Sequence, residues 1–360
     1  MPSRRVKFTV YSLLTMGLLV IAYQLIPQQP VQFPFDKEII DIHTHVAGIG
    51  AGDSGIVVSS TLLEGYKFDI YLKAFGVTEE QLHAEGDVAV LHSLSQRVSQ
   101  SKTVSKAVVL ALDGVVDNGV LNLNKTQLYV PNEFLVRELP NFPNLLFGAS
   151  VNPHRVDALQ RLETVKKHGA VLIKWIPAIM DIDPSDKALK PYYRKLVELD
   201  LPLLIHVGQE RSFGPARDEF GDPVKLNLPL DMGVTVIAAH IATTGENQQE
   251  PNFDRILPMF RRYPNLYTEI SSLTQINKLG YLPSALRDSA LQDRMLYGTD
   301  WPLQFFPLVS PWFQVGHVTN DRLKAIQAIK NQWDRDVALK LAMGVPERVF
   351  FRTRQLLKLD

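Results

Sequence analysis

Eight apolar runs, separated by segments with helix signals, most constrain how this chain of 360 residues can fold. Each run is almost continuously apolar, which is typical of parallel strands that are buried on both faces. Between two of the runs, Asn152-Pro153 predicts the start of a helix and Gly169 predicts its end. The runs cover residues 38–45, 106–112, 145–152, 170–176, 201–207, 235–241, 265–271 and 294–300.

Eight strands that alternate with helices over about 260 residues match the size of a (β/α)8 TIM barrel, which is an α/β fold. We therefore predict this barrel for residues 31–360. Its first connection, residues 46–105, is long and opens with a glycine-rich stretch at residues 48–55. Long connections in compact domains are often lids or binding loops, so we interpret this one as a lid-like insertion. A surface insertion without a role at the site is the alternative.

The amino end is predicted to be a membrane anchor, so that a transmembrane helix precedes the barrel. Residues 8–26 contain no charged residue and are long enough to span a hydrocarbon core. Basic residues precede them, which predicts a cytoplasmic amino end and an extracytoplasmic, for example periplasmic, barrel. A cleaved signal peptide is the alternative, although bulky residues occupy positions 23–26. In the favoured, uncleaved interpretation, residues 1–30 form a signal anchor and the start of a tether, and the Pro/Gln-rich residues 27–34 make this tether stiff.

The composition excludes several classes of function. Lys plus Arg and Asp plus Glu both number 38, so the chain lacks the basic excess that is typical of nucleic-acid binding. It has no cysteine, which excludes a disulfide, a thiolate metal site and a cysteine nucleophile. It also has no Gly-x-Ser-x-Gly elbow, P-loop or dinucleotide fingerprint. A small molecule is therefore the expected partner, while the oligomeric state stays open.

Residues that can bind a metal ion lie at the ends of several runs. His43 and His45 are two positions apart, so on a strand both face the same side. His206, His240 and Asp300 end three later runs, and the carboxyl ends of barrel strands form the active-site face. Imidazoles and a carboxylate suit a divalent cation such as zinc. Each residue alone has an ordinary structural explanation, but the set at successive strand ends predicts a metal site.

Two motifs resemble the amidohydrolase superfamily of metal-dependent barrels, in its amidohydrolase-related branch. They are Asp-x-His-x-His at residues 41–45 and Gly-Thr-Asp-Trp-Pro at residues 298–302, and the resemblance extends over residues 37–358. It implies that His240 polarises the substrate or binds a second metal ion. Members include lactonases, other hydrolases and non-oxidative decarboxylases, so the substrate stays open. The implied ligands of the catalytic metal are His43, His45, His206 and Asp300.

Lys174 leaves the number of metal ions open. Residues 169–174 resemble the fourth strand of the phosphotriesterase-like branch, in which a carboxylated lysine bridges two metals. A free ammonium near a divalent cation is repelled, so Lys174 should be neutral, carboxylated or turned toward the substrate. We favour one ion, with Lys174 contacting a substrate anion. Two ions bridged by carboxylated Lys174 remain the alternative.

Three further residues are candidates for substrate binding. Arg211 and Arg217 follow the run that ends at His206, and either could clamp a substrate carboxylate or be a solvated loop charge. Trp301 follows Asp300 and could form the wall of an apolar pocket or pack within its loop.

The sequence thus predicts a metal-dependent hydrolase that acts on an ester, lactone or amide bond. In this prediction Asp300 takes a proton from the attacking water, and His240 stabilises the developing oxyanion. A non-oxidative decarboxylase of an unsaturated or aromatic acid is the alternative. A tethered barrel that binds metal without turnover is the third hypothesis.

Overall fold

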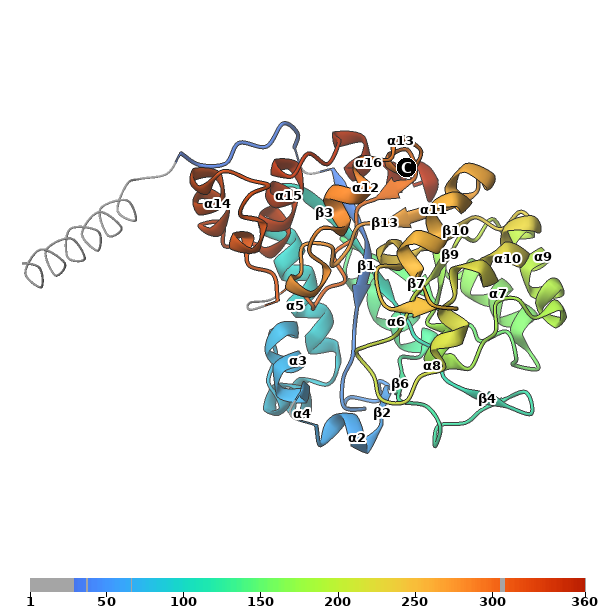
Figure 1. Ribbon diagram of the computed structural model, residues 1–360. Coiled ribbons are helices and arrows are strands. Elements are labelled where there is room, and N and C mark those ends of the chain that lie inside the picture. Colours follow the sequence, from blue (N-terminus) through green and yellow to red (C-terminus); the bar gives the residue numbers. More distant parts are fainter. Residues whose placement is uncertain (1–28, 37, 66, 305–307, 360) are drawn as a thin grey trace, which may run out of the picture.

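The computed structural model describes residues 29–36, 38–65, 67–304 and 308–359. Eight parallel strands form one sheet in the order β1-β3-β7-β8-β9-β10-β13-β14, and helices surround it (Figure 1). Every predicted run overlaps one of these strands, so the predicted strands are confirmed. They are β1 (Ile39–His45), β3 (Val104–Leu110), β7 (Leu145–Ala149), β8 (Leu172–Trp175), β9 (Leu203–Ile205), β10 (Val236–Ala238), β13 (Leu266–Glu269) and β14 (Met295–Leu296).

The sheet closes between its first and its last strand. The Asp300 N–H donates to the His43 carbonyl at 2.8 Å, and the His45 N–H donates to the Trp301 carbonyl at 2.8 Å. Thr44 and Trp301 also form a parallel bridge. The predicted α/β (β/α)8 TIM barrel is therefore confirmed.

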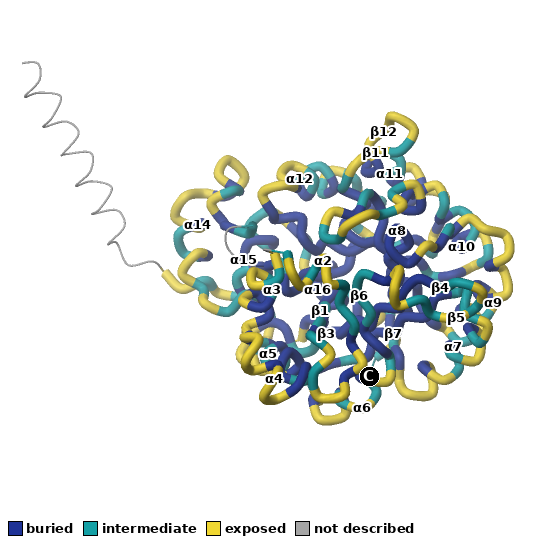
Figure 2. The backbone as a smooth tube through the Cα atoms, turned by 90° about the horizontal axis from the view of Figure 1, so that it is seen from below, coloured by how far each residue is buried: buried dark blue, intermediate teal, exposed yellow. Residues whose placement is uncertain are grey.

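Helices cover the outside of the barrel, and the strands are buried beneath them (Figure 2). The smaller strands pair as β2 (Val57–Val58) with β6 (Leu128–Tyr129), β4 (Val116–Asp117) with β5 (Val120–Leu121), and β11 (Glu246–Asn247) with β12 (Glu250–Pro251). The α-helices are α2 (Ser60–Leu63), α3 (Lys67–Phe75), α4 (Glu79–Glu85), α5 (Val88–Ser99), α6 (Asn132–Glu138), α7 (Ala158–Lys167), α8 (Pro177–Met180), α9 (Lys190–Glu198), α10 (Asn227–Asp231), α11 (Asn252–Arg262), α12 (Tyr281–Ala285), α13 (Ser289–Gln292), α14 (Asn320–Gln327), α15 (Gln332–Ala342) and α16 (Glu347–Leu356).

The predicted helix start at Asn152 is wrong, because α7 begins only at Ala158. The Asn152 side chain is buried and donates to the carbonyls of Gly114 and Met180, both at 2.9 Å. Asn152 therefore ties loops together instead of capping a helix. The predicted end is confirmed, since α7 stops just before Gly169, whose φ is 84°.

The long connection between β1 and β3 is largely helical. It contains β2 and the helices α2 to α5, which lie together on one side of the barrel (Figure 1). Helix α5 packs against both β3 and α3, so it takes the place of the first crossover helix of the barrel. The remaining elements, α2 to α4, are thus an addition to the basic barrel.

The predicted transmembrane segment, residues 8–26, lies outside the described residues. Among the helices that the structure does describe, none is long and apolar enough to cross a bilayer. Residues 29–36, which include the described part of the predicted tether, pack on the barrel domain. Phe35 contacts the rings of Phe350 and Phe351, with centroids 5.8 and 4.9 Å away.

A buried carboxylate fixes the join between β1, β14 and α15. Asp41 accepts hydrogen bonds from the His43 N–H at 3.1 Å and from the Thr299 N–H and hydroxyl at 3.0 and 2.5 Å. It also accepts one from the Trp333 indole N–H at 2.8 Å. Burial raises the pKa of Asp41 to about 7, although the bonds from Thr299 and Trp333 oppose this. These contacts hold the backbone that carries His43 next to the start of the segment that carries Asp300.

We expect Trp333→Phe to lower the free energy of unfolding by about 2–4 kcal/mol, because it removes a buried hydrogen bond to a carboxyl group and leaves a gap. Urea unfolding of chelator-treated protein measures this change. Trp312→Phe is the matched control, because Trp312 is 39% exposed and its change should stay within about 0.5 kcal/mol. Equal losses in the two variants would show that the Asp41–Trp333 bond does not stabilise the fold.

Candidate active site

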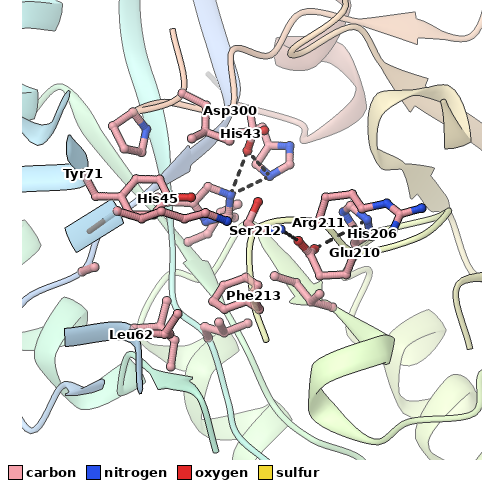
Figure 3. A pocket seen from close by; sticks show the side chains of 18 of the residues that line it. His43, His45, Leu62, Tyr71, His206, Glu210, Arg211, Ser212, Phe213 and Asp300 are labelled. Carbon is pink, nitrogen blue, oxygen red and sulfur yellow. Dashed lines mark hydrogen bonds and ion pairs between the residues drawn. The ribbon is translucent and has the colours of Figure 1, made fainter. Parts of the chain in front are cut away.

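Two histidines and an aspartate converge where the barrel closes. The His43 Nε2 atom lies 3.0 Å from His45 Nε2 and 3.6 Å from Asp300 Oδ1. The His45 Nε2 atom lies 3.1 Å from the same Asp300 oxygen (Figure 3). The ligand atoms of all three residues lie within 4.8 Å of one another, so they can surround a single cation.

An irregularity in β1 aims the histidine pair at this centre. The register between β1 and β3 shifts between Asp41 and Thr44. Within this irregular stretch, Ile42 packs in the apolar cluster that residues of β3, β8, β9, β10 and β14 also form. His43, in the same stretch, and His45, after it, line the cavity above that cluster. Strict alternation would place His43 and Ile42 on opposite faces, so the shift is what turns the histidines inward.

Glu269, at the end of β13, orients His43. Its Oε1 lies 3.1 Å from His43 Nδ1, and the carboxylate also accepts from the backbone N–H groups of His240 at 2.9 Å and Ser271 at 2.6 Å. Burial alone would raise the pKa of Glu269, but His240, His43 and Ser271 lower it below its usual range. An ionised carboxylate only accepts, so the proton of His43 lies on Nδ1 and the Nε2 lone pair faces the cavity.

Glu269 was not among the predicted site residues, although its sequence position carries a signal. The residue lies inside the apolar run 265–271, and a carboxylate buried in such a run requires partners. Ser271 and Ser272 were missed as well. The Ser271 hydroxyl lies 2.7 Å from His240 Nδ1, and the Ser272 hydroxyl donates to Asp300 Oδ2 at 3.0 Å.

His240 and Asp300 are held in an uncommon backbone conformation. The φ angle of His240 is 56° and that of Asp300 is 62°, in the left-handed region. Ile241 and Ala242 continue this conformation, with φ of 52° and 53°. Such strain persists where surrounding contacts impose it, and here it brings the His240 ring onto the His43 ring, with centroids 5.1 Å apart. The His240 Nε2 atom then lies 3.8 Å from Asp300 Oδ2.

Lys174 and His206 lie beside this group. The Lys174 Nζ atom is 3.0 Å from His43 Nε2, and burial lowers the pKa of Lys174 to about 8. The His206 ring lines the same cavity and lies 5.5 Å from the His240 ring, measured between centroids. Its Nε2 faces Glu210 Oε2 at 3.6 Å, so His206 is outside the tight ligand group. The ligand role of His206 stays a prediction.

The residues present fit a divalent cation. The His45 Nε2 atom lies 3.0 Å from His43 Nε2 and 3.1 Å from the Asp300 oxygen. Because the proton of His43 is on Nδ1, its Nε2 lone pair is available to a metal ion. The Nε2 atom of His206 is buried and has no hydrogen-bond partner among the residues that the structure describes. Nitrogen and oxygen donors of this kind suit zinc as well as other first-row divalent ions.

Two of the predicted substrate residues lie away from the cavity, whereas Arg211 lines it and contacts Gln209. The Arg217 guanidinium pairs with Asp181 at 2.8 Å and with Glu219 at 3.0 Å, and the side chain is 55% exposed. The guanidinium donors of Arg217 therefore point to surface acids, and Arg217 does not line the cavity.

Trp301 is fully buried behind the site and does not line the cavity. Its ring packs between Phe75 and Trp333, with centroids 5.1 and 6.2 Å away. Phe75, from α3, forms part of the cavity wall in its place.

The cavity has a volume of about 210 Å³ and two unlike ends. In Figure 3, His43 and Asp300 lie at one end, while Leu62 and Phe213 lie well away from them. The lining near α2 and α3 is apolar, and the added helices thus close the site on that side. The apolar lining residues are Val58, Leu62, Phe68, Tyr71, Leu72, Phe75, Leu112, Leu128, Ile176 and Phe213, among others.

Similarity to a protein family shows to which group of barrel proteins the chain belongs. The amidohydrolase family model matches residues 40–307, which is more than half of the chain. The chain belongs to the amidohydrolase family. This membership supports an enzyme that acts on a small molecule, and it confirms the resemblance that the two sequence motifs carry. No curated protein sequence matches the chain.

Solved structures similar to this amidohydrolase include an uncharacterised TIM-barrel protein from Bordetella bronchiseptica. It is 17% identical, has a TM-score of 0.52 and covers 84% of this chain and 99% of its own, which supports the fold alone. A putative 2-pyrone-4,6-dicarboxylic acid hydrolase from Pseudomonas putida is 15% identical, with a TM-score of 0.48 and coverages of 89% and 97%. A 5-carboxyvanillate decarboxylase from Novosphingobium aromaticivorans, solved with bound manganese, is 13% identical, with a TM-score of 0.42 and coverages of 89% and 97%.

We expect Glu269→Gln to weaken zinc binding by about 10- to 100-fold, because the amide no longer fixes the proton of His43 on Nδ1. Competition with a chromophoric chelator measures the affinity, and circular dichroism checks the fold. Glu198→Gln, at a residue whose side chain is 63% exposed on α9, is the control and should bind zinc as the unmodified protein does. An unchanged affinity in Glu269→Gln would contradict the orienting role.

The stability of the metal-free protein should fall as the pH drops from about 6.5 to 4. Burial lowers the pKa of His43 from 6.5 to about 4, so over this interval the unfolded chain binds a proton that the folded chain does not. We expect His43→Gln to make this loss smaller by about 1–3 kcal/mol. Thermal unfolding at several pH values measures it, with the exposed His317→Gln as control. A pH dependence that His43→Gln leaves unchanged would contradict this assignment.

Proposed function

We propose that this amidohydrolase is a metal-dependent hydrolase of an ester, lactone or amide bond in a small, carboxylate-bearing substrate. The observation that supports this best is the convergence of His43, His45 and Asp300 beside a largely apolar cavity. These three residues would hold the cation, and His206 is proposed as a further ligand. A divalent ion, zinc for example, would supply Lewis acidity to the scissile carbonyl and to the attacking water.

Asp300 is the proposed proton acceptor. Burial would raise the pKa of Asp300, but His240 and the hydrogen bond from His45 lower it well below its ordinary value. The carboxylate therefore stays ionised and can take a proton from the attacking water, then return it to the leaving group. Ser272 donates to Oδ2 at 3.0 Å and so keeps Asp300 in place while the other oxygen faces the histidines.

His240 is proposed to stabilise negative charge on the carbonyl oxygen. When the Ser271 hydroxyl donates to Nδ1 over 2.7 Å, the remaining ring proton lies on Nε2. That nitrogen faces the same space as Asp300 Oδ2, 3.8 Å away. A donor held in place by the protein costs no reorganisation as the charge develops, which is the basis of oxyanion stabilisation.

A non-oxidative decarboxylase of an unsaturated or aromatic acid is the second candidate. The apolar wall that α2 and α3 provide would suit the ring of such an acid. His240 or Asp300 would then deliver a proton to carbon. The number of ions would depend on Lys174. As a free lysine it would contact a substrate anion beside one ion, whereas a carboxylated Lys174 would help to hold two ions, with His240 as a further ligand.

The placement of the enzyme is part of the same proposal. The uncharged residues 8–26, with basic residues before them, would anchor the chain in a membrane and leave the barrel on the extracytoplasmic side.

We expect Asp300→Asn to lower kcat/KM by at least about 100-fold on zinc-loaded protein, because the amide cannot accept the proton. The assay uses a panel of esters, lactones and amides, and zinc per chain is measured in parallel because Asp300 is also a ligand. Asp254→Asn, at an exposed residue of α11, is the control.

A rate that survives in Asp300→Asn would contradict the hydrolase mechanism. Release of carbon dioxide from an acid, without incorporation of oxygen from labelled water, would favour the decarboxylase instead.

A further inference from the structure

A buried lysine that the proposed mechanism does not use lines the cavity. Lys278 ends a short 3-10 helix, Ile276–Lys278, in the loop after β13, and only 6% of its surface is exposed. Its side chain lines the same cavity as His206, His240 and Asp300. Within the described part of the chain, its ammonium group has no hydrogen bond and no ion pair. A buried charge without a partner is costly, so a partner from outside the chain is expected.

The nearby carboxylates do not neutralise this ammonium by contact. Burial lowers the pKa of Lys278, while Asp300, Glu269 and Glu210 act on it in the opposite direction from a distance. Asp300 and Glu269 are held by histidines, as described above. Glu210 accepts from the Ser212 N–H at 2.6 Å and faces His206 at 3.6 Å. A cation at the centre would offset their charge further, which leaves Lys278 free for an anion.

The other cations that line the cavity differ from Lys278. Lys174 contacts His43 at 3.0 Å, whereas Arg211 contacts Gln209 and is exposed. Lys67, at the start of α3, is exposed and therefore solvated. Lys278 thus combines burial with an ammonium group that has no hydrogen bond or ion pair to any described residue, and these three do not.

The apolar end of the cavity indicates which chemical groups the uncharged part of the ligand carries. Leu62, from α2, and Phe213 line it and lie well apart from His43 and Asp300 in Figure 3, whereas Tyr71, from α3, lies beside His45. Hydrophobic burial at this end favours an aromatic or aliphatic group. A ligand that fills the cavity therefore needs a charged end and an apolar body.

We propose that Lys278 binds the carboxylate of the substrate, while an aromatic or aliphatic body of the same molecule packs against α2, α3 and Phe213. Lys278 thereby selects acids over neutral molecules of the same shape. The proposal deepens the proposed function, on which it rests for the bond that is cleaved but not for the binding of the anion.

The test compares 3-phenylpropionate with the neutral 3-phenylpropionamide by isothermal titration calorimetry on the zinc-loaded, full-length chain. In Lys278→Met, the affinity for the acid should fall at least about tenfold, the scale of one lost charge-assisted hydrogen bond. The affinity for the amide should change by less than about twofold, because the side-chain volume is kept. Lys278→Arg should recover part of the loss, and Lys187→Met, at an exposed lysine, should change neither ligand.

Equal losses for the acid and the amide, or no loss for the acid, would overturn the proposal. Failure of the unmodified protein to bind either probe would also overturn it. Misfolding is checked by the melting temperature, which should not fall in Lys278→Met because the change removes an unpaired buried charge.

The two proposals fail separately. If the ester, lactone and amide panel gives no turnover but Lys278→Met still lowers the affinity for the acid, the hydrolase proposal is contradicted and the anion site is supported. If turnover is found and Lys278→Met binds the acid as tightly as the unmodified protein does, only the anion-site proposal is contradicted.

Discussion

The active site depends on the hydrogen bonds that close the barrel between its first and last strands. Asp41 accepts from the backbone of both segments and from α15, so the residues that follow it on β1 and the residues around Thr299 share one buried anchor. Asp300 lies one position after Thr299, and its N–H donates to the His43 carbonyl. Ligand candidates that are more than 250 positions apart in sequence thus meet because the same bonds that complete the fold also set their distance.

The buried carboxylates near this site are of two kinds, those that line the cavity and those that do not. Asp41 and Glu269 have no free face toward the cavity, and each accepts several hydrogen bonds that fix backbone or ring positions. Asp300 and Glu210 line the cavity and can act on what enters it. Asp41 and Glu269 therefore fix the backbone and the ring next to Asp300, which is the kind of support that orients the ligands of a metal site.

The added helices give this barrel its own pocket. In Figure 1, α3 and α4 lie beside α5 rather than in the ring of barrel helices. Residues of α2 and α3 line one end of the cavity. The metal-ligand candidates come from strand ends, whereas the apolar wall comes largely from this insertion. In the proposed function, the chemistry and the choice of substrate would therefore reside on different parts of the fold, which share a cavity that Lys278 also lines.

Local sequence determined the strands, the barrel and most of the candidate ligands, because apolar periodicity and strand-end polarity are properties of neighbouring residues. Only the tertiary structure decided which polar groups meet. The register shift in β1 turns His43 inward. Glu269 contacts His43, and Lys278 lines the cavity, because the fold brings segments together that are far apart in sequence. Arg217 instead pairs with surface acids. Burial and pairing are set by contacts between distant segments, and no local pattern encodes those contacts.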